Sequence, residues 1–472
     1  MKVFPTKKVR ELDAFTIEHE PISSINLMER AAYELFRWIT SEVSVNEHVL
    51  VFAGPGNNGG DGLALARMLY SVGYNVDVYV LSAKSYSNDF TGNYNRLKGL
   101  GVSVTELTSV KEFPKIDSNN VLVDALFGSG LTRPLEGLAA QLVLYINNLG
   151  LKVISIDIPS GLFGDENPYP NTNQVVQATV TLTLQFPKLS FFFAENYKYT
   201  GKWKVLPIGL HPEGIKKVDT NYFYIDETEV LKRTKNRETF SHKGTYGHAL
   251  IAAGSKGMVG AAVLASKAAV CAGAGLVTSA VPGCGYSILQ VNVPEALCLA
   301  DGTDNFLSEN IAIGKCNAVC IGPGIGKEQK TLSVLQNLLS SATVPLVVDA
   351  DALNLMSQNK NLLDMIPNNS VITPHPGEFD RLFGKHNSGY ERLVTAIKMA
   401  EKLGVVIIVK GAYTQVVLPS GQVYFNSTGN PGMATGGSGD VLSGIITSLL
   451  AQGYRFEDAA IVGVYVHGAA GD

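Results

Sequence analysis

A short apolar segment that ends in a loop rich in Gly, Asn or Asp recurs along this chain, and this pattern constrains the fold more than any other feature. The first full case is HVLVFAGPGNNGGDGLALARMLYSVGYNVDVYVL, residues 48–81, where a strand, a Gly/Asn loop, a helix and a second strand follow one another. This order is a βαβ unit. Strands at VLVDA, KVISI and ATVTLTL continue the first half, and HALIAAG, AVCIG, VPLVVDA, SVITP, VVIIV and TQVVLP repeat the pattern in the second. We therefore expect an α/β protein with two doubly wound domains.

The position of the domain boundary follows from a break in this pattern. A chain of 472 residues has room for about two to four domains. Around residues 208–225 a stretch with Gly, Pro and Lys interrupts the alternation of strands and helices. We place the boundary near 215–222 and expect one domain at 1–215 and a second at 222–472.

Composition favours a soluble, cytoplasmic enzyme. Charged residues make up 17% of the chain, the net charge is −4 and no dense run of Lys and Arg occurs, so we expect no nucleic-acid or membrane partner. The start of the chain lacks the apolar core of a signal peptide, and helical spacing predicts helices at 6–19 and 24–39. The long apolar stretch 259–282 contains Lys267 and many small residues, which indicates close helix packing. Five cysteines without a CxxC motif favour reduced thiols.

A glycine-rich stretch at residues 425–444, FNSTGNPGMATGGSGDVLSG, precedes an apolar helical pattern. Glycine is favourable where the backbone approaches a ligand closely or adopts a positive φ. The run from Gly436 to Gly439 would end at a helix N-terminus, where unpaired N–H groups bind anions such as phosphate. Asp440 would lie in the first turn, placed to take a proton from a hydroxyl that receives a phosphoryl group. The alternative is a glycine-rich turn with Asp440 as a helix cap.

Polar side chains follow several strands of the first half. Because ligands of open α/β sheets bind beyond the carboxyl ends of strands, we expect Asn58, Asp61, Asp124, Asp157 and Ser160 to converge. Oxygen ligands without Cys or His suit a hard cation, or ribose and phosphate groups. Each aspartate has an alternative role as a loop cap. The loop GPGNNGGDG lacks GxGxxG spacing and no acidic residue closes the next strand, so ordinary dinucleotide binding is weakly supported.

The second half has its own polar strand ends. His375 lies between two prolines in TPHPGEF, a stiff loop that favours ligand contact over core packing. Asp349 and Asp351 in VVDADALN would position Mg²⁺ through water or cap the next helix, and the sequence favours neither. Lys410 and Gly411 place a cation and a flexible turn where a nucleotide phosphate could lie.

Eight motifs together resemble the bifunctional NAD(P)H-hydrate repair enzymes: GPGNNGGDG, DALFGSGL, DIPSGL, GPGIG, DADALN, TPHPGEF, VKGAYT and NPGMATGGSGDVLSG. In that family a Rossmann-like NAD(P)HX epimerase domain is fused to an ADP-dependent NAD(P)HX dehydratase domain with a ribokinase-like fold. The resemblance covers nearly the whole chain. It implies that the enzyme epimerises the R and S forms of NAD(P)HX and dehydrates the S form to NAD(P)H, converting ADP to AMP and phosphate.

The resemblance also implies roles for individual residues. Catalysis is implied for Asp157 at the hydrated ring and for Asp440. Contacts with NAD(P)HX are implied for Asn57, Asn58, Gly59, Gly60, Asp61, Gly128, Ser129, Gly130, Leu131, Thr132, Arg133, Pro134, Asp157, Ala261, Gly324, His375 and Asp440. Contacts with the adenine nucleotide are implied for Lys410, Gly411, Ala412, Tyr413, Thr414 and Gly439, and K⁺ ligands for Asn58, Asp124 and Ser160. A family lysine beyond the second strand corresponds only loosely to Lys84.

The expected cofactors are K⁺ in the epimerase domain and Mg²⁺ with ADP in the dehydratase domain, in a homo-oligomer. The sequence does not distinguish ADP from ATP, or NADHX from NADPHX. The chain stops at GVYVHGAAGD within an expected helix, whereas members of the family usually continue for another helical stretch. Either the sequence is truncated or the natural terminus is short, and the sequence does not distinguish the two. The alternative function is a ribokinase-like kinase for a small molecule such as a vitamin precursor, with an amino-terminal half that only binds a ligand.

Overall fold

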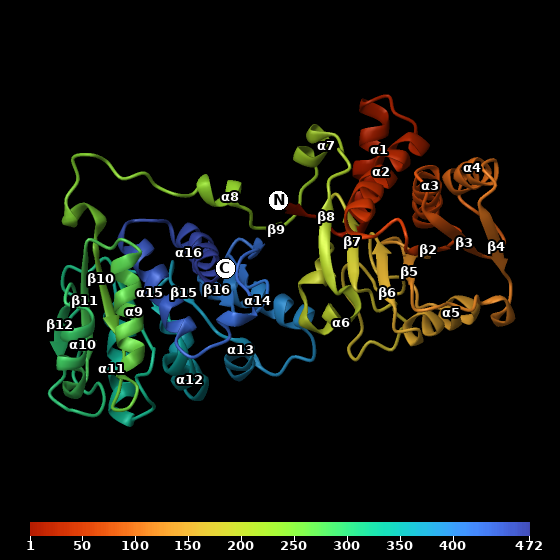
Figure 1. Ribbon diagram of the computed structural model, residues 1–472. Coiled ribbons are helices and arrows are strands. Elements are labelled where there is room, and N and C mark those ends of the chain that lie inside the picture. Colours follow the sequence, from red (N-terminus) through yellow and green to blue (C-terminus); the bar gives the residue numbers. More distant parts are fainter. The chain divides into compact units, whose positions relative to one another are not determined.

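The computed structural model describes residues 1–472, which divide into two compact units (Figure 1). The N-terminal unit comprises residues 2–220 and 388–390. The C-terminal unit comprises Met1 with residues 221–387 and 391–472. Each unit is built around its own sheet, and an α/β architecture with two domains is confirmed.

The sheet of the N-terminal unit is wholly parallel, with the strand order β4-β3-β2-β5-β6-β7-β8. Its strands are β2 (His48–Ala53), β3 (Asn75–Leu81), β4 (Ser103–Leu107), β5 (Asn120–Ala125), β6 (Lys152–Ile156), β7 (Val180–Leu184) and β8 (Lys202–Leu206). The chain first runs outward from β2 to β4 and then returns to the other side of β2 with β5. This reversal is the topological switch point of a Rossmann-like sheet, where loops separate and leave room for a ligand.

Helices cover both faces of this sheet (Figure 1). On one side lie α2 (Ser24–Glu42), α3 (Asn57–Ser71) and α4 (Asn88–Lys98), and on the other lies α5 (Gly137–Asn148). Along β2, Val49 and Val51 pack with the first group of helices, whereas Leu50 and Phe52 pack with α5. The period of two places successive residues on opposite faces, and both faces are apolar because both are covered. The remaining elements are β1 (Lys2–Val3), α1 (Thr6–His19), α6 (Tyr197–Thr200) and α7 (Pro212–Lys217).

The two opening helices are confirmed, but the loop GPGNNGGDG is shorter than predicted because α3 already begins at Asn57. Close packing explains why glycines occupy this helix start. A Cβ added at Gly59 would lie 1.8 Å from the Gly54 carbonyl oxygen, and one added at Gly62 would lie 2.5 Å from the Ala125 Cβ. The glycines therefore allow the first turns of α3 to lie directly against the ends of the central strands.

The sheet of the C-terminal unit is mixed, with the strand order β9-β18-β17-β16-β15-β14-β13-β10-β11-β12. Its strands are β9 (Tyr222–Tyr224), β10 (His248–Ala252), β11 (Leu276–Val281), β12 (Leu297–Ala300), β13 (Ala318–Ile321), β14 (Leu346–Val348), β15 (Val371–Ile372), β16 (Val406–Val409), β17 (Gln415–Val417) and β18 (Val423–Phe425). From β12 to β16 neighbouring strands are parallel, and β17 is antiparallel to both β16 and β18. The parallel part again brings the carboxyl ends of several strands to one edge.

The helices of this unit include two that contact each other closely, α9 (Val259–Cys271) and α15 (Ser438–Ala451). The others are α8 (Glu227–Leu231), α10 (Tyr286–Asn292), α11 (Gln329–Ser341), α12 (Ala350–Gln358), α13 (Pro376–Phe383), α14 (Gly389–Leu403) and α16 (Phe456–Gly471). A Cβ added at Gly444 of α15 would lie 2.1 Å from the Ala265 carbonyl oxygen of α9. Close helix packing is therefore confirmed for residues 259–271 of the small-residue stretch, whereas residues 276–281 of the same stretch form the strand β11. No helix combines the length and apolar character that crossing a bilayer requires.

We predict that Gly444→Ala destabilises the C-terminal unit, because the added methyl group would overlap the α9 backbone. Overpacking of this kind costs about 1–3 kcal/mol. Gly260→Ala is the matched control: Gly260 is also helical, but a Cβ there would meet nothing within 4 Å. That variant should be neutral or more stable by up to about 1 kcal/mol, since alanine favours helix. Thermal unfolding of the full chain measures both, and equal melting temperatures would show that the contact between α9 and α15 tolerates a methyl group.

Two candidate active sites

The candidate site of the N-terminal unit lies at its topological switch point. Asn58 is in the first turn of α3 after β2, Asp124 is near the end of β5, and Asp157 and Ser160 follow β6. The structure joins Asp124 to Ser160 and places Asn58 beside the loop that follows β5, where a Cβ added at Gly128 would lie 3.2 Å from the Asn58 Oδ1. Side chains that are far apart in the sequence therefore gather at one edge of the sheet.

Asp124 is buried and accepts several hydrogen bonds. The Ser160 hydroxyl donates to it at 2.5 Å, the Ser155 hydroxyl at 2.8 Å, and the backbone N–H groups of Ser160 and Leu126 at 2.9 and 3.2 Å. Burial raises the pKa of Asp124, and these hydrogen bonds offset the effect only in part. A buried carboxylate in this setting would be stabilised by a nearby cation.

Asn58 adds a further polar group to this edge. Its side chain is 7% exposed, and its Nδ2 has no hydrogen-bond partner. A buried N–H donor without a partner is unfavourable, which points to a ligand that accepts a hydrogen bond at this position. The carboxylate of Asp124, the hydroxyl of Ser160 and the amide oxygen of Asn58 supply only oxygen donors, and this donor set suits a hard monovalent cation.

Asp157 has an unusual backbone conformation and a buried cationic partner. Its φ is +66°, a left-handed conformation that non-glycine residues rarely adopt and that commonly marks functional sites. The Lys188 Nζ donates to Oδ1 at 2.6 Å, and the backbone N–H of Ser129 donates to Oδ2 at 3.2 Å. Burial acts to raise the pKa of Asp157, but the Lys188 ammonium and these hydrogen bonds outweigh it, so the pKa lies below its ordinary value.

Two further carboxyl groups near Asp157 have raised pKa values, in contrast to Asp157. Asp61 is 8% exposed, and burial raises its pKa well above the ordinary value, with additional contributions from the charges of Asp157 and Asp13. Burial, followed by the charge of Asp157, raises the pKa of Asp13 to about 6. An ionised carboxylate therefore lies near Asp61, whose protonated form is favoured by burial, and such a pair suits a general base and a general acid.

Other predicted residues of this unit lie farther from Asp157. Thr132, Arg133 and Pro134 are exposed at the end of their loop, and Asn57 and Lys84 are exposed as well. Gly130 instead packs against α1, where an added Cβ would overlap the Arg10 guanidinium, at 2.4 Å from Nη2. No described contact connects these side chains with the Asp157 carboxylate, and their role as substrate contacts stays a prediction.

The candidate site of the C-terminal unit is centred on the start of α15. Gly437, at φ +93°, is the N-cap of this helix, and Asp440 lies in its first turn without forming a cap hydrogen bond. The alternative that Asp440 serves as a helix cap is therefore excluded. Burial, followed by the charge of Asp349, raises the pKa of Asp440 to about 6. A Cβ added at Gly439 would lie 3.4 Å from the Lys410 Nζ, so the helix start and this lysine are neighbours.

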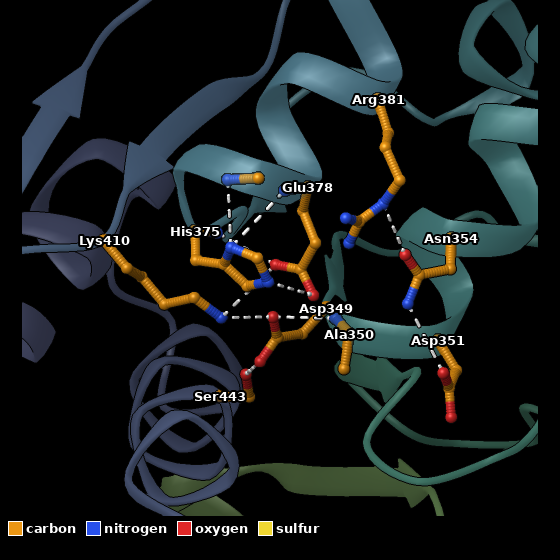
Figure 2. Close-up of polar contacts among 10 residues, drawn as sticks. Asp349, Ala350, Asp351, Asn354, His375, Glu378, Arg381, Lys410 and Ser443 are labelled. Carbon is orange, nitrogen blue, oxygen red and sulfur yellow. Dashed lines mark hydrogen bonds and ion pairs between the residues drawn. The ribbon is translucent and has the colours of Figure 1, made fainter. Parts of the chain in front are cut away.

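Asp349 connects α12, α15 and the turn after β16 (Figure 2). Its side chain caps α12 by accepting a hydrogen bond from the Ala350 N–H at 2.8 Å. Capping this helix was one of the two roles predicted for Asp349. It also accepts from the Lys410 Nζ at 2.7 Å and from the Ser443 hydroxyl at 2.8 Å. Ala350 has a φ of +49°, so the backbone is strained where it delivers this carboxylate. Asp351 accepts from the Gly326 N–H at 3.0 Å.

His375 is half-exposed and is the N-cap of α13 (Figure 2). Its Nδ1 accepts from the backbone N–H of Gly377 at 3.0 Å, and its Nε2 lies 3.5 Å from the Glu378 carboxylate. The Lys410 Nζ lies 3.9 Å from the same carboxylate. Burial raises the pKa of Glu378, and the charge of Lys410 opposes this effect. His375 is thus not a core histidine, and it belongs to the same group of charges as Lys410.

The remaining predicted residues surround this group. A Cβ added at Gly324, whose φ is +62°, would lie 3.1 Å from the Ala261 Cβ, so these two residues are neighbours. Lys410 to Thr414 form the turn between β16 and β17, where the Thr414 hydroxyl donates to the Gly411 carbonyl at 2.8 Å. No group of three His, Cys, Asp or Glu side chains is arranged to bind a metal. A divalent cation would therefore bring ligands with it, such as nucleotide phosphates and water.

Sequence reasoning did not assign roles to four residues that make close contacts here: Lys188, Asp13, Glu378 and Ser443. Glu378 stands within the quoted motif TPHPGEF, and Lys188 follows a strand end in QFPK, so each had a weak local signal. Ser443 stands within the quoted motif NPGMATGGSGDVLSG but in its apolar helical part, and Asp13 lies on an amphipathic helix, where nothing in the local sequence indicates a site.

These features define a protein of two α/β domains, each with buried, paired acidic groups at the carboxyl ends of its parallel strands. Comparison with protein families assigns residues 249–472 to the NAD(P)H-hydrate dehydratase family and residues 24–190 to the YjeF-related protein N-terminus family. Bifunctional NAD(P)H-hydrate repair enzymes Nnr of Moorella thermoacetica and Thermofilum pendens are 35% and 37% identical, each covering 100% of this chain and 92% of the relative. The chain belongs to the family of bifunctional NAD(P)H-hydrate repair enzymes.

A crystal structure of the ADP/ATP-dependent NAD(P)H-hydrate dehydratase of Bacillus subtilis, co-crystallised with ATP and Mg²⁺, is also similar. The sequence identity is 31%, the TM-score is 0.44, and the match covers 53% of this chain and 89% of that protein.

Proposed function

We propose that this chain repairs hydrated nicotinamide nucleotides with two activities. The N-terminal unit interconverts the R and S forms of NAD(P)HX, and the C-terminal unit dehydrates the S form to NAD(P)H while ADP becomes AMP and phosphate. The observation that carries the proposal is the same in both units. A strand-end aspartate paired with a lysine lies near a carboxyl group whose pKa is raised: Asp157 near Asp61, and Asp349 near Asp440.

The epimerase reaction acts on a hydroxyl group at the carbon next to the ring nitrogen. Asp157, ionised, removes the hydroxyl proton, the carbon–oxygen double bond forms, and the carbon–nitrogen bond breaks. The electron pair moves to nitrogen, which needs a proton, and Asp61 is the neighbouring carboxyl group that favours its protonated form. Rotation and ring closure on the other face, with both proton transfers reversed, then invert the centre.

The dehydratase reaction must first convert hydroxide into a better leaving group. Asp440 takes the proton of the substrate hydroxyl, whose oxygen attacks the β-phosphorus of ADP, and AMP departs. Backbone N–H groups at the start of α15 and the Lys410 ammonium stabilise the charge on the transferred phosphoryl group. Phosphate then leaves the ring carbon, the adjacent carbon loses a proton, and the double bond of NAD(P)H is restored.

We further propose roles for the residues around each reacting group. In the C-terminal unit, Ala261, Gly324 and His375 contact NAD(P)HX, and Gly439 and the turn 410–414 contact the nucleotide. The closeness of Gly439 to Lys410 and of Gly324 to Ala261 supports these assignments. In the N-terminal unit, the helix start 57–61 and the loop 128–134 contact the substrate. The hydrogen bond from Ser129 to Asp157 and the position of Gly128 beside Asn58 support this part.

We also propose that each unit uses a cation. Asn58, Asp124 and Ser160 would hold K⁺, which supplies positive charge beside the buried Asp124 and orders the loops that carry these residues. Mg²⁺ would enter with ADP, held by the nucleotide phosphates and water. Burial and the negative charges of Asp349 and Asp351 raise the pKa of Asp440, and such charges would favour a cation nearby.

A first prediction concerns K⁺. At constant ionic strength, replacing K⁺ with tetramethylammonium should slow epimerisation and lower the melting temperature, because the bulky ion cannot take the place of K⁺ beside Asp124. Asp124→Asn should abolish the difference between the two salts, whereas Asp117→Asn, at an exposed position, should preserve it. A wild-type enzyme with the same rate and melting temperature in both salts would argue against a cation at this site.

A second prediction concerns Asp440. Asp440→Asn should reduce the dehydration rate by about 10²–10⁴-fold, as loss of a general base does, and leave epimerisation intact. In the wild type, kcat/KM for dehydration should rise as pH increases through about 6 and then level off, because Asp440 accepts a proton only when ionised. Asp364→Asn, at an exposed site, is the matched control. A stable phosphorylated product with ATP would instead support the small-molecule kinase.

A third prediction separates the two activities. If the dehydratase accepts one epimer, the wild-type enzyme should consume a mixture of both completely, and Asp157→Ala should leave one unreacted. Its progress curve should fall quickly and then slow, because misplacement of the reacting hydroxyl costs about 10²-fold in rate. Measurement within minutes near neutral pH limits spontaneous epimerisation. If Asp157→Ala follows the wild-type time course, the N-terminal unit is only a binding module.

A further inference from the structure

The Lys188 side chain of the N-terminal unit is buried, and all of its hydrogen-bond donors have partners. It is 2% exposed, and its Nζ donates to the Asp157 Oδ1 at 2.6 Å, the Thr183 hydroxyl at 2.9 Å and the Phe186 carbonyl oxygen at 3.2 Å. An ammonium group has three N–H donors, so each has a partner within the protein. Lys188 therefore has no donor left for a substrate, and its contacts fix its position.

The segment between β7 and Lys188 is shaped to hold the ammonium at this place. Gln185 has a φ of +60°, which turns the chain back after β7. The Phe186 N–H donates to the Leu184 carbonyl oxygen at 2.7 Å, and the Thr183 hydroxyl donates to the Phe186 carbonyl oxygen at 3.0 Å. The strained turn and its hydrogen bonds bring two oxygen acceptors to the lysine.

The two oxygens of Asp157 have different surroundings. Oδ1 accepts hydrogen bonds from the Lys188 Nζ and, at 3.4 Å, from the Leu184 N–H. Oδ2 accepts from the Ser129 N–H at 3.2 Å, in the loop proposed to contact the substrate. The salt bridge thus fixes the carboxylate through one oxygen and leaves lone-pair capacity on the other, at the side of the substrate loop.

We propose that Lys188 is the positioning residue of the epimerase site: it holds Asp157 through Oδ1, keeps it charged, and presents Oδ2 to the substrate hydroxyl. The proposal rests on the proposed role of Asp157. It explains how a buried carboxylate acts as a base although the groups that face it from α3 and α1 are the carboxyl groups of Asp61 and Asp13. Arg10 on α1 acts on Asp13, and Lys188 supplies the positive charge that acts on Asp157.

Lys188→Met tests this role because methionine fills similar space without a charge. The nearby opposite charge lowers a carboxyl pKa by about 1–3 units, so its loss should move the acid limb of the epimerisation profile upward by that amount. Near pH 5 the variant should be slower than the wild type, by about 10-fold or more towards the upper end of that range, and should recover as the pH rises to 9. The wild-type rate should change little over this range, because Asp157 is already ionised. Dehydration by the same full chain provides an internal reference.

Lys202→Met on the neighbouring strand β8 is the matched control, because Lys202 is exposed. It should keep the wild-type rate and profile. If Lys188→Met is too unstable to assay, Thr183→Val provides the test, since it removes one partner of the ammonium at a fully buried position and keeps the side-chain shape. A smaller upward shift of the acid limb is then expected.

Asp157→Asn, assayed in parallel, separates the two proposals. If Asp157→Asn epimerises at the wild-type rate, the proposed role of Asp157 is wrong. If Asp157→Asn is inactive and folded Lys188→Met keeps the wild-type rate and profile, the role of Lys188 alone is overturned. A folded Lys188→Met that is equally slow at every pH also overturns it, because its rate would then not recover as Asp157 becomes ionised. For Thr183→Val, an unchanged profile would count against the proposal.

Discussion

The close approach of glycine backbone to neighbouring main chain is the constraint on which both sites depend. A Cβ added at Gly54 would lie 1.8 Å from the Leu126 carbonyl oxygen, and one added at Gly322 would lie 1.8 Å from the Asp349 carbonyl oxygen. Any side chain there would push apart the loops that carry the functional groups. Because the loops are held this tightly, polar side chains from separate strands reach one another without long, flexible connections. The glycines of the motifs therefore serve the architecture of the site as well as contact with a ligand.

In both units, an ion pair with a lysine keeps a strand-end aspartate charged. The Lys188 Nζ lies 2.6 Å from Asp157, and the Lys410 Nζ lies 2.7 Å from Asp349. Burying a charge without a partner is strongly unfavourable, so each pair offsets the desolvation of its own members. The fixed negative charge then acts on a second carboxyl group and helps to raise its pKa. The two lysines differ in accessibility: the Lys188 side chain is 2% exposed, whereas that of Lys410, in the turn after β16, is 21% exposed.

The sequence predicted most of the central strands and the residues at their ends, because both leave a local signal. It missed β11, whose apolar residues follow the small-residue run of α9. Buried parallel strands are continuous apolar runs, and Asn58, Asp124 and Asp157 come directly after such runs. The edge strands β4, β8 and β12 were not predicted. In SVTEL and KWKVL exposed polar residues interrupt the apolar run, and LCLA is apolar but short and mostly exposed. The early start of α3 was missed for a related reason, since glycine signals a loop locally while close packing of the helix on the strands is a tertiary property.

The residues that contact the acidic groups left no comparable signal in the sequence. These residues nevertheless determine which acidic group acts as the base and which as the acid. Asp157 and Asp61 are both strand-end aspartates in the sequence, and nothing local makes one a base and the other an acid. The difference arises because Lys188, 31 residues after Asp157, bonds to one of them, while burial and neighbouring carboxylates act on the other. The positive φ of Asp157 supports this distinction, because the strain is tolerated only where surrounding contacts fix the side chain. The motif therefore specifies which residues meet, and the tertiary contacts specify which of them holds a proton.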